Sequence, residues 1–468
     1  MVAMPEPSEA RHTPSRSASA VRRHRDTPPG PRGLPVIGVA PQLARDPYGT
    51  LDSIAREYGD VAAVPVPGIQ LVLVSHPDDV KRVMTDVAGY PLPPMMTDVL
   101  FREPPRFHAM ANGEEWRQVR RALTPKFTRR GLDPLGHLIS SAVSDTLDSW
   151  ERYADTDQLV DMQRELSILT MTVLLRSMFT RPAPRTEVER LANAFPDLTI
   201  GMTVSMFTTP LPGWMPRPFD RRFTAAKASI GAYVDEMVAE RRRNPLEGDD
   251  LLNMLLNARF ENGSPMGAEQ LRRELMGLLF AGFETTALAM SWVLARLPFA
   301  PEAQARAYDE ADALGHSGAT PDDLSSLPWI RACFDEAQRM QGVLIGRGAA
   351  VDDEIGGYRI PAGTTVLFSG QRLHNDPRWW SDPAKFDPGR FLDGNINMNA
   401  FIPFGLGPRR CLGGQMAYMV GVSTLASAFQ RYSFQPPSGW IPEPRFTIST
   451  VVKGGVPMTI SSRSSAGS

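Results

Sequence analysis

Residues 404–413 read Phe-Gly-Leu-Gly-Pro-Arg-Arg-Cys-Leu-Gly, and this stretch decides the fold. Its glycines let the backbone turn where a side chain would collide, and they let a flat ligand approach closely. The run presents one thiol, Cys411, ahead of a helix-like stretch that begins at Gln415. Backbone amides turned toward a thiolate stabilise it and tune the metal that it binds. A lone cysteine in such a loop is more often a small buried apolar residue, so the other motifs of the chain must decide between the two interpretations.

The bulk composition describes a globular chain. It has 468 residues, 42% of them hydrophobic, which supports a sizeable core and excludes a wholly disordered protein. The formal net charge of −2 argues against a general attraction to nucleic acid. The only cysteines are Cys333 and Cys411, so we expect no disulfide framework and a reducing compartment. The sequence contains no run of eighteen apolar residues, which predicts a soluble, cytoplasmic protein without a membrane anchor.

The domain organisation is simple. Residues 1–27 are rich in Ser, Pro, Arg and Ala and predict a disordered N-terminal tail. A stiff proline-rich segment at 28–35 then opens the folded part. The later sequence shows neither an internal repeat nor a shift in composition, which predicts a single domain over 28–462 and a C-terminal tail over 463–468.

Helical spacing of apolar residues dominates the pattern. It predicts helices over 47–58, 114–127, 132–153, 162–179, 220–243, 268–297 and 328–340. Strand signals are shorter and come in pairs around turn residues. They predict three hairpins, formed by 61–66 with 70–74, by 358–360 with 364–368, and by 445–452 with 456–460. The predicted fold class is therefore mainly α with small antiparallel β-sheets (α+β).

The cysteine stretch matches the pattern Phe-x-x-Gly-x-Arg-x-Cys-x-Gly at every fixed position. It resembles the haem-binding loop of the cytochrome P-450 family, in which the cysteine is the proximal iron ligand. The resemblance covers residues 28–462 and implies that family's fold, a triangular helix-rich prism with the haem between a long central helix and the cysteine loop. It implies Cys411 as the axial ligand of haem b. The neighbouring residues that it implies against the cofactor are Phe404, Gly405 and Gly413.

The longest apolar helix contains the run Ala-Gly-Phe-Glu-Thr-Thr at 281–286. A buried acid costs several kcal/mol unless it is paired or hydrated. Gly282 and the threonine hydroxyls are expected to loosen the helical hydrogen bonds here. A solvated helix face with a satisfied glutamate would explain the same residues. The run is similar to the family's Ala-Gly-x-Asp/Glu-Thr-Thr segment, which implies Thr285 and Glu284 as the acid–alcohol pair that delivers protons for O–O cleavage.

Glu336 and Arg339 lie three residues apart on one face of a predicted helix. As an exposed ion pair they would contribute only about 0–1 kcal/mol. The run Phe-Asp-Pro-Gly-Arg-Phe at 386–391 resembles another family segment and supplies Arg390 as a third member. The resemblance implies a buried network of these three residues that holds the cysteine loop in place and takes no part in the chemistry.

Trp116 and Arg120 are four residues apart on a predicted helix, and an ordinary helix face with a basic edge would explain them. The resemblance implies that they contact the haem propionates, together with Arg409 and Arg347, because guanidinium groups bind carboxylates through two parallel hydrogen bonds. The segment 340–347 departs from the family, since it lacks a Pro-Pro step and is two residues shorter. We therefore expect a differently shaped loop over the haem.

The resemblance also implies a substrate pocket rich in methionine and phenylalanine, which together form an adaptable apolar surface. The expected pocket residues are Met95, Met96, Phe101, Met206, Phe207, Phe280, Phe283, Leu344 and Ile345. Core packing would explain any one of them, but the set favours a lipophilic substrate.

Together these features predict a haem-thiolate monooxygenase that uses O2 to oxidise, most simply to hydroxylate, a terpenoid or related secondary metabolite. Fatty acids and polyketides are alternative substrates, and oxidative cyclisation, desaturation and C–N or C–C coupling are alternative outcomes. A non-catalytic haem-binding or sensor protein is an alternative from another class. We expect electrons from NAD(P)H through a separate ferredoxin or flavodoxin and its reductase, no nucleic-acid partner, and a monomer.

Overall fold

The structure is a computed structural model that describes residues 27–97, 106–208, 219–246, 248, 250–446 and 449–463, with only the backbone described for 206–208. The predicted N-terminal tail lies outside these ranges except for Thr27, and the predicted C-terminal tail lies outside them from residue 464 onward. Arg463 is anchored, since its Nη2 lies 2.8 Å from Oδ2 of Asp312. The anchored chain thus reaches one residue beyond the predicted end of the domain.

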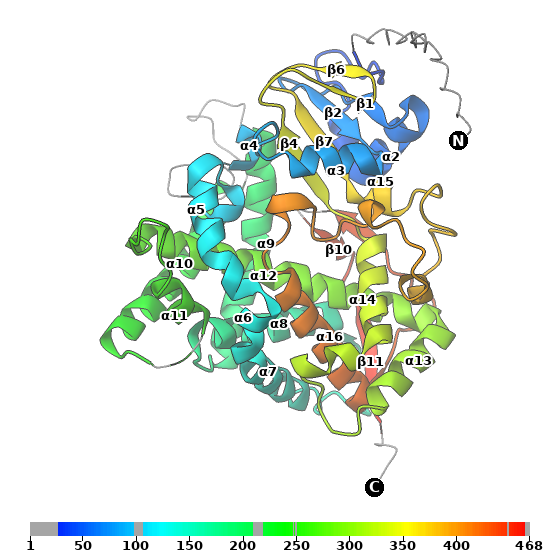
Figure 1. Cartoon of the computed structure of the whole chain (residues 1–468). Helices are drawn as coiled ribbons and strands as arrows, with labels where there is room; N and C mark the ends of the chain where they lie inside the picture. The colour runs from blue at the N-terminus through cyan, green and yellow to red at the C-terminus, as the bar shows by residue number, and fades with distance from the viewer. Residues whose placement is uncertain are drawn as a thin grey trace, which may run out of the picture.

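Helices form most of the molecule (Figure 1). The α-helices are α1 (Ala40–Arg45), α2 (Pro47–Tyr58), α3 (Pro77–Thr85), α4 (Pro94–Thr97), α5 (Gly113–Leu123), α6 (Arg129–Leu132), α7 (Gly136–Asp148), α8 (Met162–Phe179), α9 (Arg185–Thr208), α10 (Asp220–Arg243), α11 (Leu251–Leu256), α12 (Ala268–Arg296), α13 (Pro301–Asp312), α14 (Pro328–Met340), α15 (Gly370–His374) and α16 (Gly414–Arg431). The 3-10 turns are η1 (His108–Met110), η2 (Thr124–Phe127), η3 (Asp133–Leu135), η4 (Leu297–Phe299), η5 (Pro321–Ser326), η6 (Pro388–Phe391), η7 (Met398–Ala400) and η8 (Gly407–Arg409).

Several helices begin where the sequence provides a cap. The side chain of Asp46 accepts a hydrogen bond from the Gly49 backbone ahead of α2, and Asp161 caps α8 in the same way. Proline at the first position, as in α2 and α14, removes an N–H that has no partner within the helix. The predicted helices over 47–58, 162–179, 220–243 and 328–340 are confirmed at both ends, and α12 ends one residue before its predicted end.

Two predicted helices are shorter in the structure. Helix α5 ends at Leu123, because Pro125 follows and the chain tightens into η2. The predicted helix over 132–153 starts later, since Pro134 lies in η3, and α7 ends at Asp148. The helices that were not predicted are α1, α3, α4, α6, α9, α11, α13 and α15. The prediction of a mainly α fold with small sheets is confirmed.

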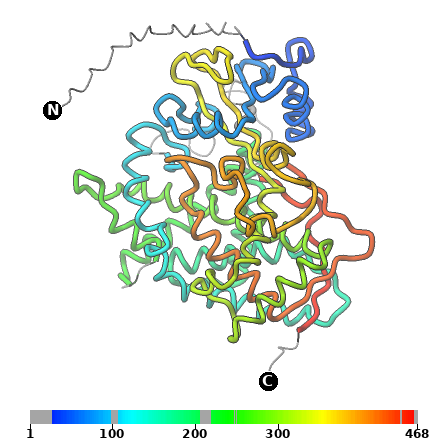
Figure 2. The backbone as a smooth tube through the Cα atoms, turned by 45° about the vertical axis from the view of Figure 1, so that its right-hand side comes forward, coloured from blue at the N-terminus to red at the C-terminus, as the bar shows by residue number. Residues whose placement is uncertain are grey.

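The largest sheet lies at one end of the molecule, at the top of Figure 1. Its strand order is β1 (Val61–Ala63), β2 (Leu71–Val74), β7 (Thr365–Ser369) and β4 (Leu344–Gly348). Figure 2 shows the yellow part of the chain, which contributes the later strands of this sheet, beside the blue N-terminal segment. The strands of the molecule are β1 (Val61–Ala63), β2 (Leu71–Val74), β3 (Val160–Asp161), β4 (Leu344–Gly348), β5 (Asp353–Ile355), β6 (Tyr358–Ile360), β7 (Thr365–Ser369), β8 (Tyr432–Gln435), β9 (Pro444–Phe446), β10 (Thr450–Val452) and β11 (Pro457–Ser462). The antiparallel pairing of β1 with β2 confirms the first predicted hairpin.

The other two predicted hairpins are wrong. Strand β6 pairs with β5, whereas β7 pairs with β4 and, in parallel, with β2. Strand β10 pairs with β9, inside the segment predicted as one strand, and β11 pairs with β3 and β8. Turn residues indicate where the chain reverses, but they do not determine which strand it meets next. The parallel β2–β7 pair also corrects the expectation of purely antiparallel sheets.

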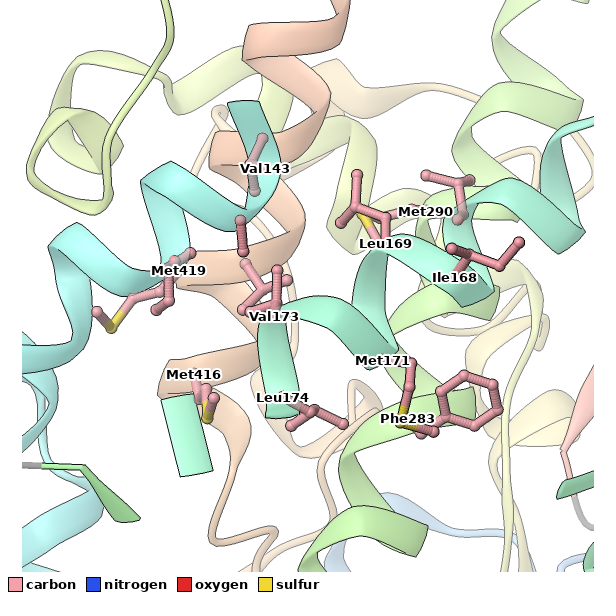
Figure 3. Close-up of a cluster of buried hydrophobic side chains, with 14 of the residues drawn as sticks. Val143, Ile168, Leu169, Met171, Val173, Leu174, Phe283, Met290, Met416 and Met419 are labelled. Atoms are coloured by element: carbon pink, nitrogen blue, oxygen red, sulfur yellow. The ribbon is translucent and has the colours of Figure 1, made fainter. Parts of the chain in front are cut away.

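Helix α12 is the central element of the helical part and packs against α8, α14 and α16. Figure 3 shows part of this core, with Leu169 and Met171 on α8, Phe283 on α12 and Met416 on α16. Burying one such side chain stabilises a fold by roughly 1.5–3 kcal/mol. In the described part of the chain, α12 with its extension to Phe299 is the one helix long and apolar enough to cross a membrane, and 61% of its apolar window is buried.

Candidate active site

A cavity of about 530 Å³ lies between α12, β4 and the loop that precedes α16. Cys411 is exposed, and it lines this cavity. Cys333 is fully buried within α14 and is absent from the described cavity wall. The thiol of Cys411 is therefore the one that a ligand in the cavity can reach.

The loop that carries Cys411 depends on two glycines. Gly405 and Gly407 have φ values of +71° and +70°, in the left-handed region that favours glycine. A Cβ atom on Gly407 would lie 2.7 Å from the carbonyl oxygen of Met84. The backbone N–H of Cys411 donates to the Phe404 carbonyl at 2.7 Å, which closes the loop. This geometry explains the glycine spacing seen in the sequence.

Several groups act on the Cys411 sulfur. The protein atoms packed around the cavity desolvate the thiol and raise its pKa, although its surface is open to the cavity, while the backbone N–H groups of Gly413 and Gly414 and the guanidinium groups of Arg120 and Arg410 lower the pKa. Gly413 and Gly414 also form the start of α16, where a helix presents its positive end. The loop thus provides the hydrogen bonds and positive charge that stabilise a thiolate.

Four arginines line the cavity, namely Arg120, Arg347, Arg409 and Arg410, and no salt bridge joins any of them to a carboxylate among the described residues. Burial lowers the pKa of Arg347 to about 10, and burial together with Arg347 and Arg120 lowers that of Arg409 to about 10. Buried cations are costly unless an anion compensates them. The cluster is therefore suited to a ligand that carries more than one negative charge.

The individual contacts strengthen this conclusion. Arg409 donates through Nη2 to the Ala111 carbonyl at 2.9 Å and to Asn112 Oδ1 at 2.8 Å, but its buried Nε has no partner among the described residues. Its guanidinium carbon lies 4.4 Å from the ring centroid of Trp116. Arg347 is 5% exposed and donates to the carbonyl of its neighbour Gly346 at 2.9 Å. Both side chains leave donors for a ligand.

The opposite wall of the cavity is formed by α12. Thr285 lines the cavity, and its hydroxyl donates to the Ala281 carbonyl at 2.8 Å. The helix continues through 281–286 without a break, so the expected loosening is limited to this side-chain hydrogen bond. Glu284 is absent from the cavity wall, and its Oε2 accepts from Ser449 at 3.1 Å and from Thr199 at 3.4 Å. Burial raises the pKa of Glu284, and these two hydrogen bonds oppose the rise. Ser449 itself lines the cavity.

The chain matches the family described as Cytochrome P450 over residues 28–458. It belongs to the cytochrome P450 family. It is 28% identical to cyclooctat-9-en-7-ol 5-monooxygenase of Streptomyces melanosporofaciens over 91% of this chain and 94% of that protein. It is 26% identical to pentalenene oxygenase of Streptomyces avermitilis (86% and 90% covered) and 24% identical to ferruginol synthase of Isodon rubescens (88% and 89% covered). The predicted class, a haem-thiolate monooxygenase with the P450 fold, is thereby confirmed.

A cytochrome P450 carries a haem whose iron is bound by a cysteine thiolate. The cavity of this P450 fits that group. It offers one thiol, a mostly apolar wall and four arginines without an acidic partner among the described residues; of these, Arg347 is buried and Arg409 has a buried Nε without a partner. The two propionates of a haem are the anions that such a cluster lacks.

Behind the cysteine loop, the predicted network of this P450 is assembled as an ion-paired core. Glu336 and Arg339 are both 0% exposed, and Arg339 donates through Nε and Nη2 to the two carboxylate oxygens at 2.7 and 2.9 Å. Arg390 donates through Nε to Glu336 Oε1 at 3.2 Å. Arg339 also donates to the carbonyls of His374 and Pro383, so α14 is tied to the end of α15 and to the segment around Pro383.

His374 extends this network and was missed in the sequence, because nothing in its local pattern distinguishes it. The ring is fully buried, its Nδ1 lies 3.2 Å from the Arg339 carbonyl, and its Nε2 accepts from the Ile402 backbone N–H at 2.9 Å. The second bond requires a neutral Nε2, so Nδ1 carries the proton. Burial, reinforced by Arg339, lowers the pKa of the ring to about 3. Since Ile402 lies just ahead of Phe404, His374 connects the network to the cysteine loop.

The predicted pocket residues divide into three groups. Met96, Phe280, Leu344 and Ile345 line the cavity. Phe283 and Met95 do not, which corrects that prediction; Phe283 packs into the core with its ring centroid 4.4 Å from that of Phe195. Phe101 lies outside the described residues, as do the side chains of Met206 and Phe207.

The segment without the Pro-Pro step folds tightly against α15. A Cβ atom on Gly342 would lie 2.1 Å from the Gln371 backbone nitrogen, and the carbonyl of Gly342 accepts from Tyr48 Oη at 2.5 Å. The chain then enters β4, where Arg347 lies opposite Val366 of β7. Despite the shorter segment, Arg347 still lines the cavity.

The buried pair of His108 and Glu274 was also missed in the sequence. The two side chains are in contact, and His108 lines the cavity.

Proposed function

We propose that this P450 hydroxylates a terpenoid or a related lipophilic secondary metabolite. The observation that carries the proposal is the apolar cavity with the Cys411 thiol and the Thr285 hydroxyl on its wall. The names of the relatives agree with it, since cyclooctat-9-en-7-ol, pentalenene and ferruginol are all terpenoids. We further propose a soluble, cytoplasmic monomer with one domain over 28–462.

In this proposal Cys411 provides the thiolate ligand of the iron. Arg120, Arg347 and Arg409 bind the propionates, and Trp116 holds Arg409 by a cation–π contact. Phe404, Gly405 and Gly413 shape the loop around the sulfur. When bound, the haem supplies the activation of O2 with two electrons, and the residues of this chain orient the substrate, limit water and supply protons.

Proton supply is assigned to Thr285 and Glu284. The Thr285 hydroxyl faces the cavity, and the Glu284 carboxyl is connected to the same cavity through Ser449. Because burial raises its pKa, Glu284 binds a proton more readily than an exposed glutamate and can pass it on. The electrons come from NAD(P)H through a separate ferredoxin or flavodoxin and its reductase.

The first test is the visible spectrum of the reduced protein under carbon monoxide. A Soret band near ~450 nm, expected for a thiolate opposite CO, should be present in the wild type and in the control variant Cys333→Ser, and absent in Cys411→Ser. A band near ~450 nm in Cys411→Ser would refute the assignment of the ligand. Terpenoids and fatty acids are then screened by the shift of the Soret band when a substrate binds, and each compound that binds is tested for turnover. If only fatty acids bind and react, the proposed substrate class is wrong.

The proton-delivery role is tested with Thr285→Ala. The variant should keep its haem content but form less product per NADPH consumed, because protons then reach the cavity without control. Thr286→Ala is the matched control on the adjacent position. Equal coupling in the wild type and Thr285→Ala would remove Thr285 from this role.

A further inference from the structure

One polar cluster on the cavity wall has no part in the function proposed above. His108, the first residue of η1, is 3% exposed and lines the cavity. Its ring Nδ1 lies 2.7 Å from Oε2 of Glu274, which is fully buried on α12. A histidine–carboxylate pair within an otherwise mostly apolar wall needs an explanation, because buried polar groups are costly unless they are paired.

The fold builds this pair through a glycine. A Cβ atom on Gly277 would lie 2.2 Å from Cδ2 of Phe107, so the Phe107 ring lies against α12 where residue 277 has no side chain. This contact brings His108 to Glu274, less than one helical turn earlier on α12. The backbone N–H of His108 donates to Glu274 Oε1 at 2.9 Å, so one carboxylate holds both the backbone and the ring of His108.

A third residue completes the cluster. Gln270 donates through Nε2 to Glu274 Oε1 at 2.5 Å and to the Arg106 carbonyl at 3.0 Å. Glu274 therefore accepts hydrogen bonds from its own helix and from the η1 segment. This arrangement determines the orientation of the His108 ring and places a proton on Nδ1, as a carboxylate does for many functional histidines.

The second ring nitrogen is left for a ligand. Nε2 of His108 has no hydrogen-bond partner among the described residues, although the ring is almost fully buried. A neutral ring presents Nε2 as an acceptor, and a protonated ring presents it as a donor. A hydroxyl group pairs with either form, because it both donates and accepts. The buried Glu274 carboxylate disfavours an anionic ligand group at this position.

We propose that Nε2 of His108 binds a hydroxyl group of the substrate and that Glu274 is its positioning residue. This inference rests on the proposed function and narrows the substrate class to a lipophilic alcohol, that is, a terpenoid that already carries one oxygen. Glu274 and Thr285 are both on α12, and a rise of 1.5 Å per residue separates their Cα atoms by roughly 16 Å. Because Glu274 holds His108, the existing hydroxyl is expected nearer the Glu274 end of this stretch of α12 than the Thr285 end, and oxidation is expected at another carbon of the substrate. A cyclisation quenched by water, or an earlier hydroxylation, must supply this alcohol.

The test compares two hydroxyl compounds, the phenol ferruginol and the alcohol 1-dodecanol, with their parent hydrocarbons. The haem-loaded full-length protein is titrated with ferruginol and abietatriene, which differ by one hydroxyl, and with 1-dodecanol and dodecane, and dissociation constants are taken from the Soret shift. The readout is the ratio of alcohol to hydrocarbon affinity. A hydrogen bond to His108 should raise this ratio about tenfold in the wild type relative to His108→Phe. The control His137→Phe, at an exposed histidine, should retain the wild-type ratio.

Two further variants separate hydrogen bonding from packing. His108→Gln retains a polar group near the position of Nε2 and should recover part of the alcohol preference. Glu274→Gln removes the charge that orients the ring and should lower the ratio while the reduced CO spectrum is unchanged. If His108→Phe fails to fold, the anchor is tested by comparing the alcohol-to-hydrocarbon affinity ratio of the wild type with those of His108→Gln and Glu274→Gln.

The outcomes distinguish the anchor from the proposed function. An equal ratio in the wild type and His108→Phe, or no binding of either alcohol, overturns the hydroxyl anchor. Binding of the terpenoid pair with a ratio that does not depend on His108 overturns the anchor and leaves the proposed function standing. A His108-dependent preference confined to 1-dodecanol supports the anchor and counts against a terpenoid substrate.

Discussion

The buried ring of His374 predicts a specific loss of stability in mild acid. In the unfolded chain its pKa is about 6.5, and in the folded protein burial and Arg339 lower it to about 3. Between these two values the unfolded state binds one more proton than the folded state, so the free energy of unfolding falls as the pH falls. The stabilisation is fully present above pH 6.5 and is lost as the pH approaches 3. At 1.36 kcal/mol per pH unit, about 2 kcal/mol is lost between pH 7 and pH 5.

The assay is urea unfolding of the haem-loaded protein at both pH values, followed by far-ultraviolet circular dichroism. His374→Gln is the test variant, because an amide oxygen can still accept from the Ile402 N–H but does not titrate. At pH 7 we expect the free energy of unfolding of this variant to be about 1–3 kcal/mol below that of the wild type, since the Arg339 carbonyl loses the Nδ1–H donor. Between pH 7 and pH 5, however, the variant should lose about 2 kcal/mol less than the wild type does, because it has no group that titrates at this position. His137→Gln, at an exposed histidine, should behave like the wild type. An equal loss of stability in the wild type and His374→Gln would refute the reasoning.

Two further substitutions test the ion-paired network behind the cysteine loop and the backbone conformation of the loop itself. Arg339→Met leaves the buried Glu336 carboxylate with Arg390 as its one remaining guanidinium partner among the described residues. The free energy of unfolding, measured in urea, should fall by about 3–5 kcal/mol. A fall of less than about 1 kcal/mol would contradict a buried network. Gly407→Ala introduces a side chain at φ +70° against the backbone of Met84 and should cost about 1–3 kcal/mol with a lower haem content after purification. Gly136→Ala, where the added methyl group meets nothing within 4 Å, should retain its haem, and equal haem content in the two alanine variants would argue against the proposed strain.

The sequence predicted helices better than strand pairing for a physical reason. Helix ends depend on nearby residues such as the Asp46 cap, so α2, α8, α10 and α14 were predicted to the residue. Strand pairing depends on distant partners. The turn at 361–363 was visible in the sequence, but the pairing of β7 with β2 required knowledge of a segment that lies far earlier in the chain.

The same distinction applies to the candidate site. Arg409, Trp116 and Thr285, which belong to local motifs, all line the cavity. Phe283 has the right composition for the pocket, but the helix turns its ring into the core. His108 was missed because its partner Glu274 is on another element, and a solitary acid in an apolar helix was the only available signal.

The parallel pairing of β2 with β7 has a consequence for the synthesis of the protein. Gln70 and Thr364, which adjoin these strands, are 294 residues apart in the chain. At roughly 5–20 residues per second, a ribosome needs roughly 15–60 s to produce β7 after β2 has emerged. During that interval the β1–β2 hairpin exposes an unpaired apolar edge, the kind of surface that promotes aggregation. Nascent chains that stop before residue 365 are therefore expected to depend on chaperones, and release of the complete chain should end that dependence.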